Sequence, residues 1–141
     1  MPSVRVLVVD DHEIVRQAVC KLLSSEPTLH VICQTADGEE AVRKAHELQP
    51  DLILLDITLP GISGIEAARQ IRKVAPESQI IFLSQHDSLY MVKTALQTGG
   101  HGYVTKQDAA FDLMKAIRAV RDGNRFVSKR IVDQGWVPEP I

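Results

Sequence analysis

The sequence has little cysteine, almost no net charge and no long hydrophobic run. Two cysteines in 141 residues are too few for a disulfide framework, so we expect Cys20 and Cys33 to be small buried residues in a reducing cytoplasm. The 16 basic and 18 acidic residues give a net charge of −2, which excludes a surface devoted entirely to binding a polyanion. No apolar run approaches the roughly 18 residues of a membrane helix, and the run at residues 6–9 is too short for a signal peptide. These absences predict a cytoplasmic domain without a membrane partner.

The sequence does contain a regular alternation of short apolar runs and helical patterns. The runs are rich in β-branched residues and do not alternate with polar ones, which is typical of strands buried on both faces of a parallel sheet. They cover residues 4–9, 30–33, 52–55, 80–83 and 101–104. Helical patterns follow at residues 14–23, 39–48, 65–74, 88–97 and 108–122, the last with Asp108 as its expected N-cap. This order predicts a doubly wound α/β domain of five parallel strands and five helices.

The periodicity stops after Gly123. Residues 124–141 contain no second apolar core, so we interpret residues 1–123 as the domain and 124–141 as a linker or tail. The only tryptophan, Trp136, lies in this tail, where its ring is expected to pack on the domain or on a partner. Basic residues extend from the last helix into the tail, and we interpret them as a solvated helix face because no aromatic residues are interleaved with them.

Polar residues follow four of the five strands at the point where each strand ends. Ligands of doubly wound sheets bind at these carboxyl ends. An aspartate at a single strand end is typical of a helix cap, but several carboxylates, a hydroxyl and an ammonium at one edge indicate a site. Crowded carboxylates repel each other and favour a hard cation such as Mg²⁺, beside which a carboxylate can accept a phosphoryl group. The residues are Asp10, Asp11 and His12, then Asp56, then Ser84, Gln85 and His86, and finally Thr105 and Lys106.

With these residues in order, the chain resembles the receiver domain of bacterial two-component response regulators over residues 3–123. The segments at residues 61–64 and 83–87 are most similar to receivers of the NarL/FixJ (LuxR-type) subfamily, which usually precede a helix-turn-helix DNA-binding domain. The resemblance implies a flavodoxin-like fold with strand order 2-1-3-4-5. It is carried by Asp10-Asp11, by Asp56 followed by Leu59-Pro60-Gly61 and Gly64, by Ser84, by Gly102-Tyr103 and by Lys106.

The resemblance also implies a phosphoacceptor site. Asp56 would accept a phosphoryl group from a sensor histidine kinase or a small phosphodonor. Asp10 and Asp11 would bind Mg²⁺, together with Asp56 and the backbone carbonyl of Thr58. Lys106 would pair with a phosphoryl oxygen. Such a domain is not an enzyme acting on other molecules, because it catalyses only its own phosphorylation and dephosphorylation.

A switch is implied as well. Ser84 would hydrogen-bond the phosphoryl group and draw its loop inward, and Tyr103 would rotate into the space released. Phosphorylation would thereby change the surface that controls homodimerisation or an output domain. DNA would be bound only through an output domain absent from this chain, and the function would be transcription regulation.

Some positions depart from the family pattern or tune it. Gln107 stands where many receivers have a proline with a cis bond, and we expect a trans bond because a non-proline cis bond costs about 2.5–4 kcal/mol. Gln85 is expected to narrow access to Asp56. Thr58 and His86 would flank the attacking water, and His86 would tune the lifetime of the acyl phosphate because histidine ordinarily changes charge between pH 5 and 8.

Other interpretations of the same residues are weaker. Phosphatases of the haloacid dehalogenase type have a second aspartate two residues after the nucleophile. Here Asp10 is followed at that offset by His12, which we interpret as a helix-start residue rather than a metal ligand, and Asp56 is followed by Thr58. A binding module independent of phosphorylation would not need the complete acidic set. A stand-alone receiver acting through protein contacts remains the alternative to a receiver cut from a longer regulator.

Overall fold

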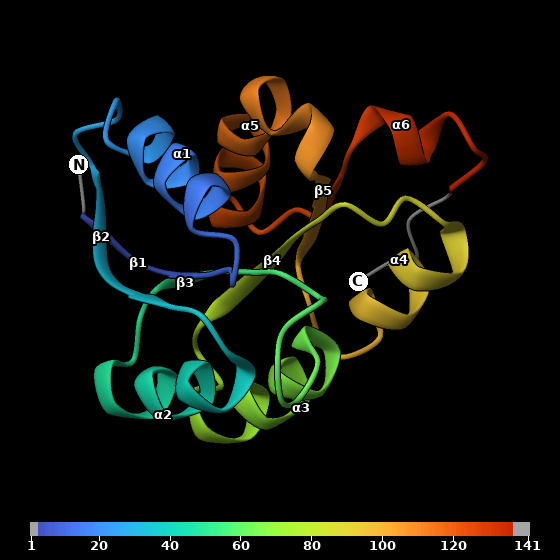
Figure 1. The fold of residues 1–141 in the computed structure, drawn as a ribbon. Coiled ribbons are helices and arrows are strands. Elements are labelled where there is room, and N and C mark those ends of the chain that lie inside the picture. The colour runs from blue at the N-terminus through green and yellow to red at the C-terminus, as the bar shows by residue number, and fades with distance from the viewer. Residues whose placement is uncertain (1–2, 137–141) are drawn as a thin grey trace.

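The apolar runs form parallel strands of one sheet, because their side chains on both faces are apolar and can be buried under helices (Figure 1). The computed structural model describes residues 3–136. In the sheet, the order begins β2-β1-β3-β4-β5, as expected for a doubly wound domain. The strands are β1 (Val4–Val9), β2 (Leu29–Thr35), β3 (Leu52–Leu55), β4 (Gln79–Ser84) and β5 (Gly102–Thr105).

Helices cover both faces of the sheet. Figure 1 shows α1 and α5 on one face and α2 and α3 on the other, with α4 at the side of the sheet near β5. A 3-10 turn, η1 (Lys106–Asp108), leads into the last long helix. The long helices are α1 (Glu13–Leu23), α2 (Gly38–Leu48), α3 (Gly64–Val74), α4 (Leu89–Leu96) and α5 (Ala109–Arg121). Within residues 3–136, no helix is long and apolar enough to cross a membrane.

Two apolar cores lie on the two faces of the sheet. Alternate residues of a strand point to opposite faces, so Leu7 and Val9 of β1 pack with α2, α3 and α4. Val6 and Val8 of the same strand pack with α1 and α5. The thiols of Cys20 and Cys33 are free and only half-buried, each at the margin of one of these cores.

Three of the six α-helix starts in residues 3–136 have a side-chain cap, and those of α1, α5 and α6 (Lys129–Val132) do not. The side chains of three N-cap residues, Asp37, Ser63 and Ser88, accept hydrogen bonds from the backbone of the first helical turn. Asp108 occupies the position before α5, as expected, but its carboxylate does not cap that helix. It accepts hydrogen bonds from the Thr105 hydroxyl (2.6 Å) and from Arg130 Nε (3.1 Å) instead.

The described chain has six strands and six α-helices, so the prediction of five of each is wrong in this detail. Strand β6 (Phe126–Val127) extends the sheet beside β5, and α6 (Lys129–Val132) follows it. Neither element has enough residues to show a sequence period, and an isolated helix of this length is unstable in water. Tertiary contacts hold both in place, because Val127, Ser128 and Ile131 are buried.

Candidate functional site

The sheet positions two aspartates side by side at the carboxyl ends of adjacent strands. Asp10 follows β1 and Asp56 follows β3, and their exposed fractions are only 3% and 2%. The backbone N–H of Asp10 donates to the Thr35 carbonyl (3.1 Å), and that of Asp56 donates to the Val9 carbonyl (3.0 Å). These backbone hydrogen bonds therefore fix the positions of the two aspartate residues at the edge of the sheet.

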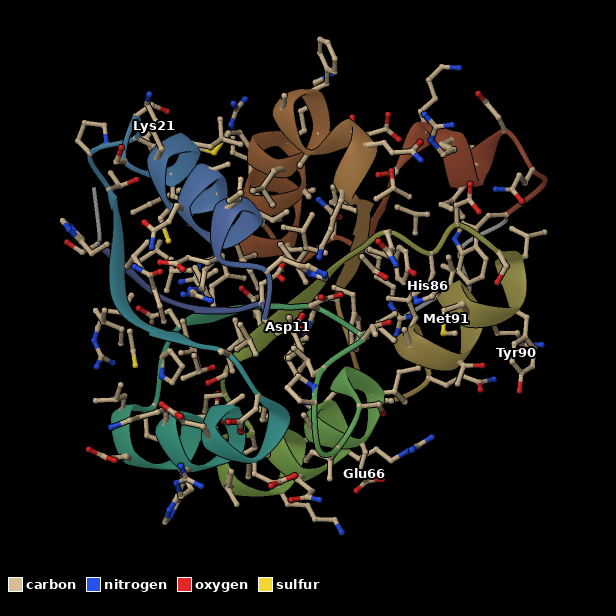
Figure 2. The ribbon with its side chains drawn as sticks, viewed as in Figure 1. Asp11, Lys21, Glu66, His86, Tyr90 and Met91 are labelled. Carbon is tan, nitrogen blue, oxygen red and sulfur yellow. The ribbon has the colours of Figure 1, made fainter. Side chains whose placement is uncertain are left out.

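These two carboxylates form part of a four-residue cluster that can bind a metal ion. Ligand atoms of Asp10, Asp11, His12 and Asp56 all lie within 4.8 Å of one another. Asp11 is exposed at the edge of the cluster, in the loop between β1 and α1 (Figure 2). Three carboxylates are hard oxygen donors, and this donor set fits Mg²⁺.

Lys106 brings a positive charge to the same place from the end of β5. Its Nζ lies 3.0 Å from Asp56 Oδ2 in a hydrogen bond and 2.8 Å from Asp10 Oδ2 in an ion pair that is not aligned as a hydrogen bond. Burial lowers the pKa of Lys106, but the two carboxylates outweigh this effect and raise it overall. Burial raises the pKa of Asp56, and the Lys106 ammonium only partly opposes that rise.

The loop between β4 and α4 approaches the site from the other side. The buried Ser84 hydroxyl accepts a hydrogen bond from the backbone N–H of His86 (3.1 Å). The His86 ring lies 2.8 Å from the Thr58 hydroxyl, so the loops after β3 and β4 are joined. Figure 2 shows His86 in this loop. Gln85 is exposed beside it.

The side chain of Tyr103 is completely buried beneath this loop, next to Phe82. Its hydroxyl donates a 2.8 Å hydrogen bond to the His86 carbonyl. Burial raises the pKa of Tyr103 to about 12, while the neighbouring Ser84 hydroxyl acts in the opposite direction. The Tyr103 ring therefore occupies the inward position in this structure, and its hydroxyl lies beside Ser84, the other residue of the expected switch.

Gly64 lets α3 begin directly against the backbone of Asp56. A Cβ atom at Gly64 would lie 1.9 Å from the Asp56 carbonyl oxygen, which no side chain can satisfy. The backbone N–H of Gly64 also donates to the Ile57 carbonyl (2.7 Å). This glycine is therefore required by the close approach of two backbones at the site.

His12 and Arg16 both contact the acidic cluster or its backbone, and the contact of Arg16 was not predicted. His12 does start α1, as expected, but its Nδ1 also lies 3.2 Å from Asp10 Oδ1 and 3.3 Å from Asp11 Oδ1. Arg16 Nη1 donates to the Asp10 carbonyl (2.7 Å). The spacing of four residues from His12, the N-cap of α1, is the signal that places Arg16 in the first turn beside it.

Two further expectations concern the end of β5. The peptide bond between Lys106 and Gln107 is trans, as expected for a non-proline residue. The Thr105 hydroxyl donates to Asp108 and not to the acidic cluster. Thr105 was predicted to lie with the other polar strand-end residues, but its hydroxyl instead joins the end of β5 to the start of α5.

Comparison with known proteins agrees with this geometry. A family model for the response regulator receiver domain matches residues 6–118, a range that includes every predicted site residue. Response regulator GacA of Pseudomonas viridiflava is 37% identical over 131 residues, which are 93% of this chain and 61% of that protein. Transcriptional regulatory protein DegU of Brevibacillus brevis is 33% identical over 129 residues, which are 92% of this chain and 55% of that protein.

A solved structure is similar over nearly the same length. The crystal structure of a LuxR-family two-component response regulator from an Aurantimonas species has a TM-score of 0.89 and 37% identity. The match covers 93% of this chain and 94% of that one. In contrast, this chain spans only about three fifths of the length of the two curated relatives.

Proposed function

Because this chain belongs to the family of response regulator receiver domains, we propose that Asp56 is its phosphoacceptor and that a sensor histidine kinase is its phosphodonor. One observation carries the assignment of Asp56. Asp56 is 2% exposed in the acidic cluster and accepts the hydrogen bond from Lys106, whereas Asp10, which is equally buried, contacts Lys106 only as an ion pair. An Asp56 oxygen would form the new bond to phosphorus as the bond from phosphorus to the kinase histidine nitrogen breaks.

Asp10, Asp11, Asp56 and the backbone carbonyl of Thr58 would hold Mg²⁺. When bound, the ion neutralises charge on the phosphoryl oxygens. The ammonium group of Lys106 would change its ion-pair partner from the two carboxylates to a phosphoryl oxygen. Its present distances of 3.0 and 2.8 Å from Asp56 and Asp10 place it within reach of that new partner.

Ser84 and Tyr103 would report the phosphorylation. The Ser84 hydroxyl, which accepts from the His86 N–H, would donate its own hydrogen to a phosphoryl oxygen, and both bonds together would keep the loop inward over the Tyr103 ring. The Thr58–His86 contact would then control how water reaches the acyl phosphate during self-catalysed dephosphorylation. Gln85, exposed at the entrance, would limit the approach of phosphodonors.

For the complete protein we propose a cytoplasmic transcription regulator. Residues 1–123 would be the receiver, on which β6 and α6 pack, and residues 124–141 would continue from it to a DNA-binding domain that is not in this chain. Both curated relatives are longer than the matched region, and one is named a transcriptional regulatory protein. Phosphorylation would promote a homodimer that binds DNA through that output domain.

Mass spectrometry after incubation with Mg²⁺ and acetyl phosphate tests the phosphoacceptor. We expect one added phosphoryl group, mapped to Asp56, and none in Asp56→Asn. Asp122→Asn, which changes an exposed carboxylate at the opposite end of α5, should be labelled like the wild type. Labelling of Asp56→Asn at the wild-type level would refute the assignment, and release of many phosphates per protein without an adduct would indicate an enzyme instead.

A further inference from the structure

The chain after α5 returns to the domain and lies along β5. We name residues 126–136 the brace. Val127 and Ile131 are buried in the core on the face of α2, α3 and α4, and Trp136 packs against the same core. Figure 1 shows α6, within the brace, between the start of α5 and α4. Within the brace, Ser128 and Gln134 contact the carboxyl edge of the sheet, where the proposed phosphoacceptor lies.

The first half of the brace is anchored to the end of β5. The Ser128 N–H donates to the Tyr103 carbonyl (3.0 Å), and the buried Ser128 hydroxyl accepts from the Thr105 N–H (3.1 Å). Arg130 binds the Asp108 carboxylate, to which the Thr105 hydroxyl also donates. These contacts surround the backbone from which Lys106 extends to Asp56.

The second half of the brace contacts the loop between β4 and α4. Gln134 Nε2 donates a 2.8 Å hydrogen bond to the Asp87 carbonyl. The adjacent carbonyl, that of His86, accepts the 2.8 Å hydrogen bond from the Tyr103 hydroxyl. Two neighbouring peptide groups of one loop are thus held from two sides, by β5 and by the brace.

We propose that the brace is a positioning element of the phosphorylation switch, which holds the β4–α4 loop over the inward Tyr103 ring. The proposal rests on the proposed function, because the phosphoryl group on Asp56 would favour the same loop position through Ser84. Two events that favour one conformation reinforce each other, and the coupling is reciprocal. Phosphorylation tightens the brace, and a docked brace favours phosphorylation.

This arrangement gives the signal a covalent route out of the domain. The brace is continuous with the residues that follow Trp136, toward the proposed output domain. A change in the loop beside Asp56 therefore reaches the brace through Gln134, two residues before Trp136, without a second protein molecule. The contact between the brace and the β4–α4 loop is a single hydrogen bond from the side-chain amide of Gln134 to the Asp87 carbonyl.

Trp136 makes the proposal measurable, because it is the only tryptophan in the chain. Quenching of its fluorescence by acrylamide is recorded in the 141-residue chain with Mg²⁺, before and after addition of beryllofluoride, a phosphoryl mimic. We expect beryllofluoride to decrease quenching in the wild type. Mass spectrometry of acetyl phosphate-treated samples monitors Asp56 separately.

Variants of Gln134 test the contact itself. Gln134→Ala removes the donor, and Gln134→Glu places a carboxylate against the Asp87 carbonyl, so the second change should have the larger effect. We expect the apparent affinity for beryllofluoride to fall about two- to tenfold in Gln134→Ala, the range for one neutral hydrogen bond. Lys129→Ala is the matched control, because it removes only an exposed ion pair with Asp133 within the brace.

The outcomes separate the two proposals. Absence of an Asp56 adduct would overturn the proposed function. An adduct with unchanged or increased quenching of Trp136 would overturn the brace while leaving the phosphoacceptor intact. Equal losses in Gln134→Ala and Lys129→Ala would also overturn it, since they would reflect the stability of α6 alone. Decreased quenching, lost in the Gln134 variants and retained in Lys129→Ala, would support it.

Discussion

Polar side chains at the amino ends of the parallel strands have different partners from those at the carboxyl ends. At the amino ends, the Asp51 carboxylate accepts from the Arg5 N–H (2.8 Å), and Arg5 Nη1 donates to the Gln49 carbonyl (2.9 Å). Gln79 exchanges hydrogen bonds with the end of α5 in the same way. Polar groups at this amino edge are paired with neutral or opposite partners, and their role is to join elements.

At the carboxyl edge, the negative charges of the carboxylates outnumber the positive charge of the nearby lysine. The ammonium of Lys106 contacts the two almost completely buried aspartates, Asp10 and Asp56, and the third carboxylate of the cluster, Asp11, lies within 4.8 Å of theirs. Burying like charges together is costly unless a cation joins them. A fold that needed only stability would not retain this arrangement, so the difference between the edges marks the carboxyl edge as the functional one.

Lys106→Met should have the largest effect, because it leaves two buried carboxylates without their ammonium. We expect a loss of about 3 kcal/mol in the free energy of unfolding, measured in urea without divalent cations. Addition of Mg²⁺ should restore part of that loss. If the variant were as stable as the wild type in the absence of Mg²⁺, the two buried carboxylates would not repel each other enough to destabilise the fold, and the claim of excess negative charge would be refuted.

Asp56→Asn tests the same charge through its pH dependence. The pKa of Asp56 is raised above its ordinary value of 3.8, chiefly by burial. The folded protein therefore holds this proton more tightly than the unfolded chain, so stability from this group is present at low pH and is lost as pH rises from about 4 through the raised pKa. Urea unfolding should show wild-type stability falling relative to Asp56→Asn over that interval. A constant difference would contradict the pKa shift.

His86→Ala should have a smaller effect, confined to dephosphorylation. Loss of the 2.8 Å contact with Thr58 is expected to change the rate by about fivefold, the worth of one hydrogen bond. Gln85→Ala, at the exposed neighbouring position, should alter the rate of phosphorylation and leave the rate of dephosphorylation unchanged. Dephosphorylation of His86→Ala at the wild-type rate would exclude the role.

Asp51→Ala at the amino edge should have the smallest effect. It removes one side-chain acceptor from a half-exposed position, so we expect a loss of about 1 kcal/mol in the free energy of unfolding. Phosphorylation by acetyl phosphate should proceed at the wild-type rate. A strong decrease in that rate would mean that the two edges are not independent.

The sheet and the acidic cluster could be predicted because local patterns encode them. The uninterrupted apolar run at residues 52–55 predicts a strand buried on both faces, and Asp56 directly after it must lie at the carboxyl edge. Strand β6 could not be predicted, since Phe126 and Val127 become a strand only through pairing with β5. The contact between His12 and two carboxylates likewise depends on side-chain rotation, which no spacing rule specifies.

The central claim is that the carboxyl edge carries negative charge that a divalent cation compensates. Its most direct test is the free energy of unfolding of the wild type, Asp11→Asn and Asp51→Asn as Mg²⁺ is titrated in urea. Binding to the folded state alone should stabilise the wild type in proportion to the logarithm of the Mg²⁺ concentration above Kd. Asp51→Asn should respond equally, and Asp11→Asn much less. A wild-type stability that does not change with Mg²⁺, or an equal response of Asp11→Asn, would contradict the claim.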